Sequence, residues 1–486
     1  VLFYGNEMST ALVLAGWLLW TALGSATSAR LARRTVSATG VLSAAGTLGV
    51  LLTLQALGLP ALVLAVRGAR HLLGIPLGEL APLGRMLLIC LGAPVLSAPV
   101  AGALFGWCWA YRRARHCEGT GGGPLTIYLG EALGAAAGGI AFYLVLLRFA
   151  TAWTTTLMVA AALLAIAGLV VWTARAGTGS RMVWIVAVIV VSGMAMVDHR
   201  EVERGLDARS RRWQWGPSLA AVRDTPFHNM AILENQEQVT IFTNGLWLLT
   251  EPDPATAELA VHPVLLQHPE PRRVLLLGGG LAGQIEEVLK HPGVERVDYV
   301  EQDPELIEFA GGFLDAATLR SLGDPRVSIE PLDAGTFLRR TAGQYDVVSM
   351  SVGDPINAQM NRFFTVEHFR RVREHLRPGG IFTLSVAGGG DLVGPSHARL
   401  IGALERTLEE VFAAVRVLPG ERARFFAAGE ESSLVLDGAV LATRIAERGL
   451  GLVHVRWDTL EDLMSPTRLD YLDAVLEAVG EGPVNR

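Results

Sequence analysis

The sequence has little cysteine. Three cysteines occur in 486 residues, and all lie in the apolar N-terminal half, at Cys90, Cys108 and Cys117. None belongs to a CxxC pair or to a Cys/His spacing that binds zinc, so we predict neither a disulfide framework nor a metal cofactor. We expect the three thiols to be small packing residues.

Charge is also scarce. Charged residues make up 18% of the chain, whereas a soluble protein of this size carries about 25%. The deficit is local, because Glu131 and Arg148 are the only formally charged side chains between 124 and 174. The net charge of −6 lacks the basic excess of nucleic-acid binders, so no nucleic-acid partner is predicted.

Long apolar runs take the place of these charges. A membrane-spanning helix needs about 20 apolar residues, and none of the runs resembles a cleavable secretory signal. We therefore expect residues 1–199 to form a multi-pass bundle in a lipid bilayer. Small residues at 130–139 are typical of close helix packing in lipid, and Glu131 is either a functional intramembrane carboxylate or a helix cap. The six predicted spans are 8–28, 38–66, 84–111, 125–148, 151–174 and 182–198.

The orientation of the predicted bundle is ambiguous. Basic clusters at 30–34 and 112–115 are an even number of spans apart, so both can be cytoplasmic. A third cluster at 209–212 follows three spans later, which leaves the side of the soluble half open. The chain starts without methionine and ends without a recognisable stop, so we expect both ends to be trimmed.

The second half predicts regular soluble structure. Residues 200–225 read as a juxtamembrane connector with Trp213 and Trp215 at the interface. A small antiparallel β subdomain is predicted at 226–265, with Asn244-Gly245 as a two-residue hairpin turn. Its strands are expected at 229–233, 238–242 and 246–250.

From 266 to 436 strands alternate with helices, which predicts an α/β Rossmann-like domain whose parallel sheet is covered on both faces. The last two strands are expected to form an antiparallel hairpin at one edge, and 437–486 is expected to be a peripheral helical tail. Strands are predicted at 273–277, 296–300, 326–330, 345–350, 380–386, 414–418 and 424–428. Helices are predicted at 282–291, 303–312, 333–341, 365–376 and 396–412.

A glycine turn after the first of these strands indicates a ligand site. Gly278, Gly279, Gly280 and Gly283 allow the backbone to approach a ligand closely, and Glu301 ends the next strand some twenty residues later. A carboxylate at that place accepts both hydroxyls of a ribose. The alternative is that the glycines only end a strand and that Glu301 is an exposed carboxylate.

Two further carboxylates follow later strands. Asp333 is suited to accept a hydrogen bond from an exocyclic adenine amine, to cap the helix that it precedes, or to do both. Asp354 precedes Pro355 beyond the strand at 345–350, where ligands of such sheets bind. It is a candidate general base or cation anchor, although Asp-Pro is also an ordinary start of a turn.

These residues together resemble the polyamine aminopropyltransferases, the spermidine synthase family, over roughly Phe227 to Leu436. The apolar N-terminal half is similar to the multi-pass, membrane-fused subgroup. The resemblance implies a transferase of the EC 2.5.1 type with a class I methyltransferase-type fold, acting in polyamine biosynthesis. The motifs that carry it are LLQHPEPRRVLLLGGG, EVLKHPGVERVDYVEQDPELIE, DAGTFL, GDP, FFTVEHF and LRPGGIF.

The resemblance also implies the ligands and the location. Decarboxylated S-adenosylmethionine would donate an aminopropyl group to a small amine. We expect a multi-pass protein of the bacterial inner membrane, either a homo-oligomer or part of a larger membrane complex. The cytoplasmic side is favoured for the soluble domain because the nucleoside is cytoplasmic.

The resemblance assigns roles residue by residue. Glu301 matches the ribose ligand of the family, Asp333 the adenine ligand and Asp354 the proposed base. Three positions depart from the family motifs. Leu281 replaces an acidic anchor for the aminopropyl amine, Ser351 replaces an aspartate, and Thr256-Ala257 replaces a Tyr-His pair. Glu258, His262, Gln284 and Ser351 remain as candidate residues for binding the amine.

Three functions stay open on the sequence. The first is aminopropyl transfer to an amine. The second is S-adenosylmethionine-dependent methyl transfer, since an intact methionine moiety carries its own carboxylate and needs no acidic anchor. The third is a catalytically degenerate nucleoside-binding or scaffolding subunit, of which a transporter is a variant.

Overall fold

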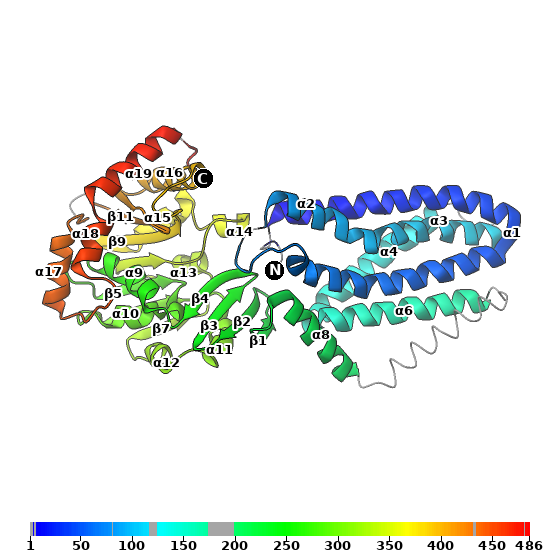
Figure 1. Ribbon diagram of the computed structural model, residues 1–486, viewed down its shortest axis with the longest axis horizontal. Helices are drawn as coiled ribbons and strands as arrows, with labels where there is room; N and C mark the ends of the chain where they lie inside the picture. The colour runs from blue at the N-terminus through cyan, green and yellow to red at the C-terminus, as the bar shows by residue number, and fades with distance from the viewer. Residues whose placement is uncertain are drawn as a thin grey trace. The chain divides into compact units, whose positions relative to one another are not determined.

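The computed structural model describes residues 3, 6–79, 81–115, 124–173, 199–430, 434–480 and 482–486. The chain divides into two compact units, Leu2–Leu219 and Ala220–Arg486. Figure 1 shows that the described part of the first unit is helical, and that the second holds the β-strands.

Five helices of the first unit are long and apolar enough to cross a membrane. They are Glu7–Ala32, Ala44–Leu72, Leu83–Arg113, Leu125–Leu146 and Ala152–Thr173. They coincide with five of the six predicted spans, whereas 182–198 lies outside the described residues. The labelled helices are α1 (Glu7–Leu72), α2 (Leu83–Gly92), α3 (Ala98–Arg115), α4 (Pro124–Ala141), α6 (Ala152–Thr173) and α8 (His199–Trp215).

Glycines bring α1 and α3 into close contact. A Cβ atom on Gly24 would lie 2.0 Å from the carbonyl oxygen of Pro99, and one on Gly102 would lie 2.0 Å from that of Thr21. The small residues at 130–139 do not lie in such a helix contact, because they are exposed on α4 among the described residues. Glu131 is exposed beyond the first turn of α4, so it does not cap the start of that helix.

The predicted connector, 200–225, is only partly helical: α8 ends at Trp215 and belongs to the first unit, and a strand at Leu219–Asp224 follows it. The Arg67 guanidinium forms an ion pair of 2.7 Å with Asp207 on α8. The Trp213 ring lies against Gly68, and Trp215 is 2% exposed. Trp215 is therefore a packing residue here.

An antiparallel sheet begins the second unit. Its strand order is β1-β2-β3-β4, with β2–β3 and β3–β4 antiparallel. Asn244 (φ 52°) and Gly245 (φ 91°) join β3 to β4, as expected for the two-residue turn. The strands are β1 (Leu219–Asp224), β2 (Asn229–Asn235), β3 (Gln238–Thr243) and β4 (Leu246–Glu251).

The main sheet has seven strands in the order β10-β11-β9-β8-β5-β6-β7. Strands β5 to β9 are parallel, and β10 and β11 form the predicted antiparallel hairpin at one edge. The order reverses between β5 and β8, which is where ligands bind in open sheets of this kind. The strands are β5 (Arg273–Leu277), β6 (Arg296–Val300), β7 (Val327–Glu330), β8 (Tyr345–Met350), β9 (Leu376–Ala387), β10 (Ala414–Leu418) and β11 (Arg422–Ala428).

Two hydrophobic cores cover the two faces of this sheet. Because side chains alternate along a strand, Val274 and Leu276 of β5 enter one core and Leu275 and Leu277 the other. Burial on both faces explains why these strands are continuous apolar runs. The covering helices are α9 (Pro254–Leu265), α10 (Ile285–Leu289), α11 (Pro304–Gly311), α12 (Ala316–Leu322), α13 (Ala334–Arg340), α14 (Ala358–Asn361), α15 (Val366–Glu374) and α16 (Pro395–Glu409).

The structure differs from the prediction at several places. Residues 254–265, predicted to belong to the antiparallel β subdomain, form helix α9. The helix expected at 282–291 begins as α10 only at Ile285, because Gly283 has a φ of 73° and Ala282 is also non-helical. The tail, predicted to be helical and peripheral, forms α17 (Gly438–Arg448), α18 (Trp457–Leu463) and α19 (Pro466–Val479). Its side chains Leu441 and Leu472 belong to the two cores and are at most 1% exposed.

Candidate functional site

The candidate residues follow strands whose carboxyl ends meet at one edge of the sheet. Leu277 at the end of β5 pairs with Val300 of β6 and with Met350 of β8, and Val300 pairs with Glu330 of β7. The glycine turn, Glu301, Asp333 and Asp354 come directly after these positions. The topology therefore places the predicted site residues along one edge of the sheet, with the glycine turn and Asp354 at the switch point and Glu301 and Asp333 on the strands beside it.

The glycine turn is required by packing as well as by conformation. Gly278, Gly279 and Gly283 have φ values of 78°, 77° and 73°, which favour glycine. A Cβ on Gly278 would lie 2.7 Å from the Ser351 carbonyl oxygen, and one on Gly280 would lie 2.6 Å from the Tyr299 ring. These contacts give the glycines a structural role beside any role in ligand binding.

Leu281 points into the protein. Its side chain is 2% exposed and belongs to the hydrophobic core that contains Val274 and Leu276. The turn thus presents backbone and no carboxylate where the resemblance implies an acidic anchor for an amine.

Glu301 is held by donors on its own strand and on the next turn. The Tyr299 hydroxyl donates to Glu301 Oε2 at 3.1 Å, and the Asp303 N–H donates to Oε1 at 3.2 Å. The Tyr299 ring lies against Gly280, where a Cβ would approach it to 2.6 Å, so Tyr299 connects the glycine turn to Glu301. Burial raises the pKa of Glu301 above its usual value, against the opposing effect of these hydrogen bonds. Each carboxylate oxygen retains capacity to accept another hydrogen bond.

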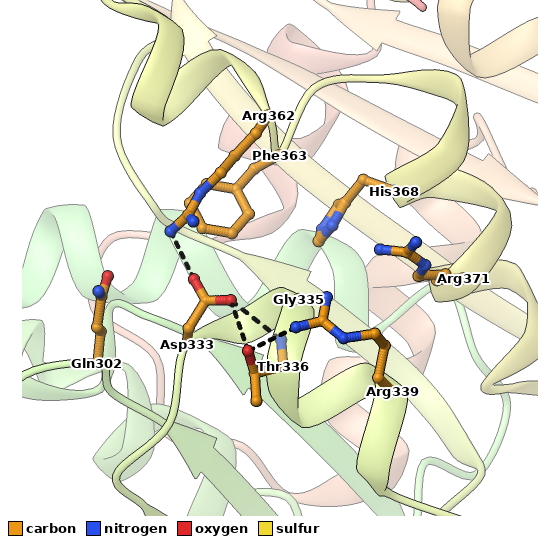
Figure 2. A pocket seen from close by; sticks show the side chains of 9 residues that line it. All are labelled: Gln302, Asp333, Gly335, Thr336, Arg339, Arg362, Phe363, His368 and Arg371. Carbon is orange, nitrogen blue, oxygen red and sulfur yellow. Dashed lines mark hydrogen bonds and ion pairs between the residues drawn. The ribbon is translucent and has the colours of Figure 1, made fainter.

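Asp333 is the N-cap of α13, as one of the two predictions for it required. Its Oδ1 accepts from the Thr336 N–H at 3.0 Å. The Arg362 guanidinium donates to Oδ2 at 2.6 Å. Asp333 also lines a cavity of about 290 Å³, which is shown in Figure 2. An adenine amine that reached Asp333 would have to share or displace Arg362.

Asp354 is likewise paired with an arginine. Arg422 at the start of β11 donates to Asp354 Oδ1 at 2.9 Å, and the Ala387 N–H donates to the same atom at 3.2 Å. The Asp354 side chain is 27% exposed. Its second oxygen carries the capacity to receive a proton or to bind a cation.

Gln284 and Ser351 form a polar pair beside the glycine turn. Gln284 Nε2 donates to the Ser351 hydroxyl at 3.3 Å. Gln284 is 7% exposed, and among the described residues its Oε1 has no hydrogen-bond partner. The Gln284 amide lies against Gly279, where a Cβ would approach it to 2.6 Å. This pair is therefore a neutral hydrogen-bonding group at the turn.

Glu258 and His262 are engaged inside the protein. The Glu258 carboxylate accepts from the backbone N–H groups of Val453, His454 and Val455 at 2.7 to 3.0 Å. Burial alone would raise the pKa of Glu258, but these three donors outweigh it and hold the pKa below its usual value. His262 is fully buried, with contacts of 3.0 Å to His291 and 2.9 Å to Glu287. Neither side chain has a free group directed to a ligand in this conformation.

Ala257 marks the position of the missing Tyr-His pair. A Cβ on Gly283 would lie 3.1 Å from the Ala257 Cβ, so the start of α9 does border the glycine turn. Small side chains there leave the turn without the aromatic and imidazole groups that the resemblance implies.

Three residues of the site were not predicted from the sequence. The sequence could have indicated Tyr299, because it stands two residues before Glu301 and its side chain therefore points to the same side of the sheet. No sequence pattern indicated Arg362 or Arg422, since their carboxylate partners lie 29 and 68 positions away along the chain. Within the part of the chain that the structure describes, no group of three or more Asp, Glu, His or Cys side chains could hold a metal ion.

Comparison with known proteins places this geometry in a family. The spermine/spermidine synthase domain model matches residues 254–417. A polyamine aminopropyltransferase of Synechococcus sp. (strain JA-2-3B'a(2-13)) is 36% identical over 205 residues, which cover 41% of this chain and 64% of that protein. One of Thermoanaerobacter sp. (strain X514) is 31% identical over 194 residues, or 39% of this chain and 67% of that protein.

A solved structure of spermidine synthase in complex with the transition state analogue AdoDATO is also similar. It is 22% identical, with a TM-score of 0.47, over 54% of this chain and 89% of that chain. The chain thus spans about two thirds of the length of the curated relatives it matches, and its first unit lies outside the matched domain. On the sequence matches, the chain belongs to the polyamine aminopropyltransferase family, the spermine/spermidine synthases.

Proposed function

We propose that this protein is a membrane-bound aminopropyltransferase that uses decarboxylated S-adenosylmethionine and a small amine. The observation that carries the proposal is the position of Glu301, next to the glycine turn and connected to it through Tyr299, whose ring lies against Gly280. A half-buried carboxylate beside a backbone turn suits a ribose whose 5′ side faces the glycines. Asp333 follows β7, which is separated from β5 and its glycine turn by β6. It would accept a hydrogen bond from the adenine amine.

The proposed reaction is a single displacement. The lone pair of a neutral amine nitrogen attacks the carbon next to the sulfonium sulfur. The carbon–sulfur bond breaks, its electron pair stays on sulfur, and methylthioadenosine leaves. The new ammonium then loses a proton, for which Asp354 is the proposed acceptor. Arg422 and the Ala387 N–H hold one oxygen of Asp354, which leaves the other for the amine.

The amine pocket is proposed to be less acidic than that of the relatives. Leu281 is in the core, and Gln284 and Ser351 offer neutral acceptors. A cationic amine in a buried site needs an anionic or strongly polar partner. We therefore expect the acceptor to carry fewer charges than a long polyamine, with the unpartnered Gln284 Oε1 accepting one of its N–H groups.

Purified full-length protein in detergent tests the activity. It should be incubated with decarboxylated S-adenosylmethionine and a panel of monoamines, diamines and polyamines, with methylthioadenosine as the readout. Amine-dependent formation of methylthioadenosine is expected. If no amine in the panel yields any, while the protein still binds methylthioadenosine, the degenerate nucleoside-binding function replaces this one.

Arg422 favours one competing function. Its guanidinium stands beside Asp354 at the edge where the donor's side chain would lie, and a cation there would pair with the carboxylate of intact S-adenosylmethionine. That donor belongs to methyl transfer. Calorimetric titration of the two donors separates the functions, because tighter binding of the decarboxylated donor contradicts methyl transfer.

The membrane assignment is part of the proposal. The five apolar helices of the first unit support a multi-pass protein of the inner membrane, with the second unit in the cytoplasm, where the nucleoside is made. The expected result is that the chain stays with membranes after extraction at alkaline pH. A C-terminal fusion should be active with a cytoplasmic reporter and inactive with a periplasmic one, and the reverse pattern would contradict the proposed side.

A further inference from the structure

Four of the nine residues that line the cavity beside Asp333 have basic side chains. Its volume is about 290 Å³. Figure 2 shows Arg339, Arg362, Arg371 and His368 around Asp333, from α13 and from the segment that leads into and forms α15. Three arginines and one carboxylate therefore line a single concave space.

Only one of these arginines is neutralised among the residues that the structure describes. Arg362 pairs with Asp333 at 2.6 Å. Arg339 donates to the uncharged hydroxyl of Thr336 at 2.7 Å. Arg371 makes no side-chain hydrogen bond or ion pair with any described residue. The lining thus carries two positive charges without a counter-charge from the described residues.

His368 adds an independent sign of a missing ligand. It is 3% exposed, it lines the cavity, and its Nε2 has no hydrogen-bond partner among the described residues. Leaving a buried polar group without a hydrogen-bond partner is unfavourable. Burial, and then the charge of Arg371, lowers the pKa of His368 to about 4, so the imidazole is neutral near pH 7. In the tautomer that carries its proton on Nε2, it donates one hydrogen bond into the cavity.

We propose that this cavity binds an oxyanion of the phosphate class, with Arg339, Arg371 and His368 as donors. Guanidinium groups match the oxygens of phosphate in geometry and charge. The oxyanion is a free inorganic ion, because a nucleoside with its ribose at Glu301 and its 5′ side toward the glycines would carry a 5′-phosphoryl group away from this cavity. The proposal does not depend on the proposed function, since neither the aminopropyl donor nor the amine is an anion.

Calorimetric titration of the full-length protein in detergent tests the subsite. Inorganic phosphate, adenosine monophosphate and adenosine are the three probes. Arg371→Gln has a matched control in Arg370→Gln, because Arg370 is exposed on the same helix and does not line the cavity. Arg339→Gln and Arg340→Gln form a second matched pair on α13, both exposed, in case the first variant does not fold.

The expected result is that inorganic phosphate binds about tenfold more weakly to Arg371→Gln or Arg339→Gln than to the control variants. Adenosine should bind all variants alike. An effect with adenosine monophosphate alone would contradict a free ion as the ligand. Equal affinities for inorganic phosphate across the matched pairs, or no binding of it, would overturn the proposal. Failure of adenosine alone to bind counts instead against the proposed nucleoside site.

Discussion

Arg422 on β11 donates a hydrogen bond of 2.9 Å to Oδ1 of Asp354, the carboxylate that follows β8. The same guanidinium also contacts the carbonyl and the hydroxyl of Ser385 on β9. The edge hairpin thereby fixes the orientation of the proposed base. Arg422 is thus a positioning residue in the proposed mechanism.

Removal of the base should affect turnover more than binding. Asp354→Asn is expected to lower kcat by about 10² to 10⁴-fold, as for loss of a general base. Arg422→Gln should lower kcat less, because the Ala387 N–H still orients Asp354. Steady-state kinetics with the best amine give both values. Asp470→Asn, an exposed residue, is the control. An Asp354→Asn enzyme with normal kcat would exclude Asp354 as the base.

The ionised Glu301 side chain is expected to lower the stability of the fold and to strengthen ligand binding. Folding raises its pKa, so the folded state holds the proton more tightly than the unfolded chain. The cost of burying the charge is absent below the unfolded pKa and is complete once the pH has risen through the folded pKa. Glu301→Gln is therefore expected to raise Tm at about pH 8, where the half-buried carboxylate is ionised. It should leave Tm unchanged at about pH 4, where the folded protein holds this carboxyl group protonated.

The same variant should bind methylthioadenosine about tenfold more weakly, since hydrogen bonds to a charged acceptor contribute about 1.5 to 3 kcal/mol. Thermal unfolding and calorimetry measure the two effects. Glu305→Gln, exposed on α11, controls for the change in net charge. Unchanged nucleoside affinity in Glu301→Gln would contradict the ribose role.

Restoring the family's acidic residues should succeed at one position and fail at the other. Ser351 is partly exposed and receives a hydrogen bond from Gln284, so Ser351→Asp is expected to lower KM for a diamine about tenfold. Leu281 is 2% exposed in the core, so Leu281→Asp should destabilise the fold, because an unpaired buried carboxylate is strongly unfavourable. Kinetics and thermal unfolding of both variants test this. A stable, more active Leu281→Asp enzyme would show that this side chain faces the amine.

Glu258 should act on stability alone. Because folding lowers its pKa, its contribution to stability is present above the unfolded pKa and is lost as the pH falls through the folded pKa. Glu258→Gln is expected to cost about 2 to 3 kcal/mol near neutral pH, and less in acid. KM for the amine should match that of Glu447→Gln, an exposed control on α17. Denaturant titrations and kinetics separate this role from the amine-binding role predicted from the sequence.

The sequence by itself determined the order of the elements and the place of the main carboxylates. Apolar runs, turn residues and helix starts are local signals, so the parallel strands, the edge hairpin and the Asn244-Gly245 turn were predictable. Because parallel strands end at one edge, the neighbourhood of Glu301, Asp333 and Asp354 followed from the same pattern.

The tertiary structure alone decided what each of these groups contacts. Glu258 meets backbone donors 195 to 197 positions away, and Asp354 meets Arg422 across the sheet. Leu281 enters the core because the turn at Gly278–Gly279 and the bend at Gly283 direct its side chain inward. Such partners depend on the packing of distant segments, whereas a sequence pattern reports the preferences of neighbours along the chain.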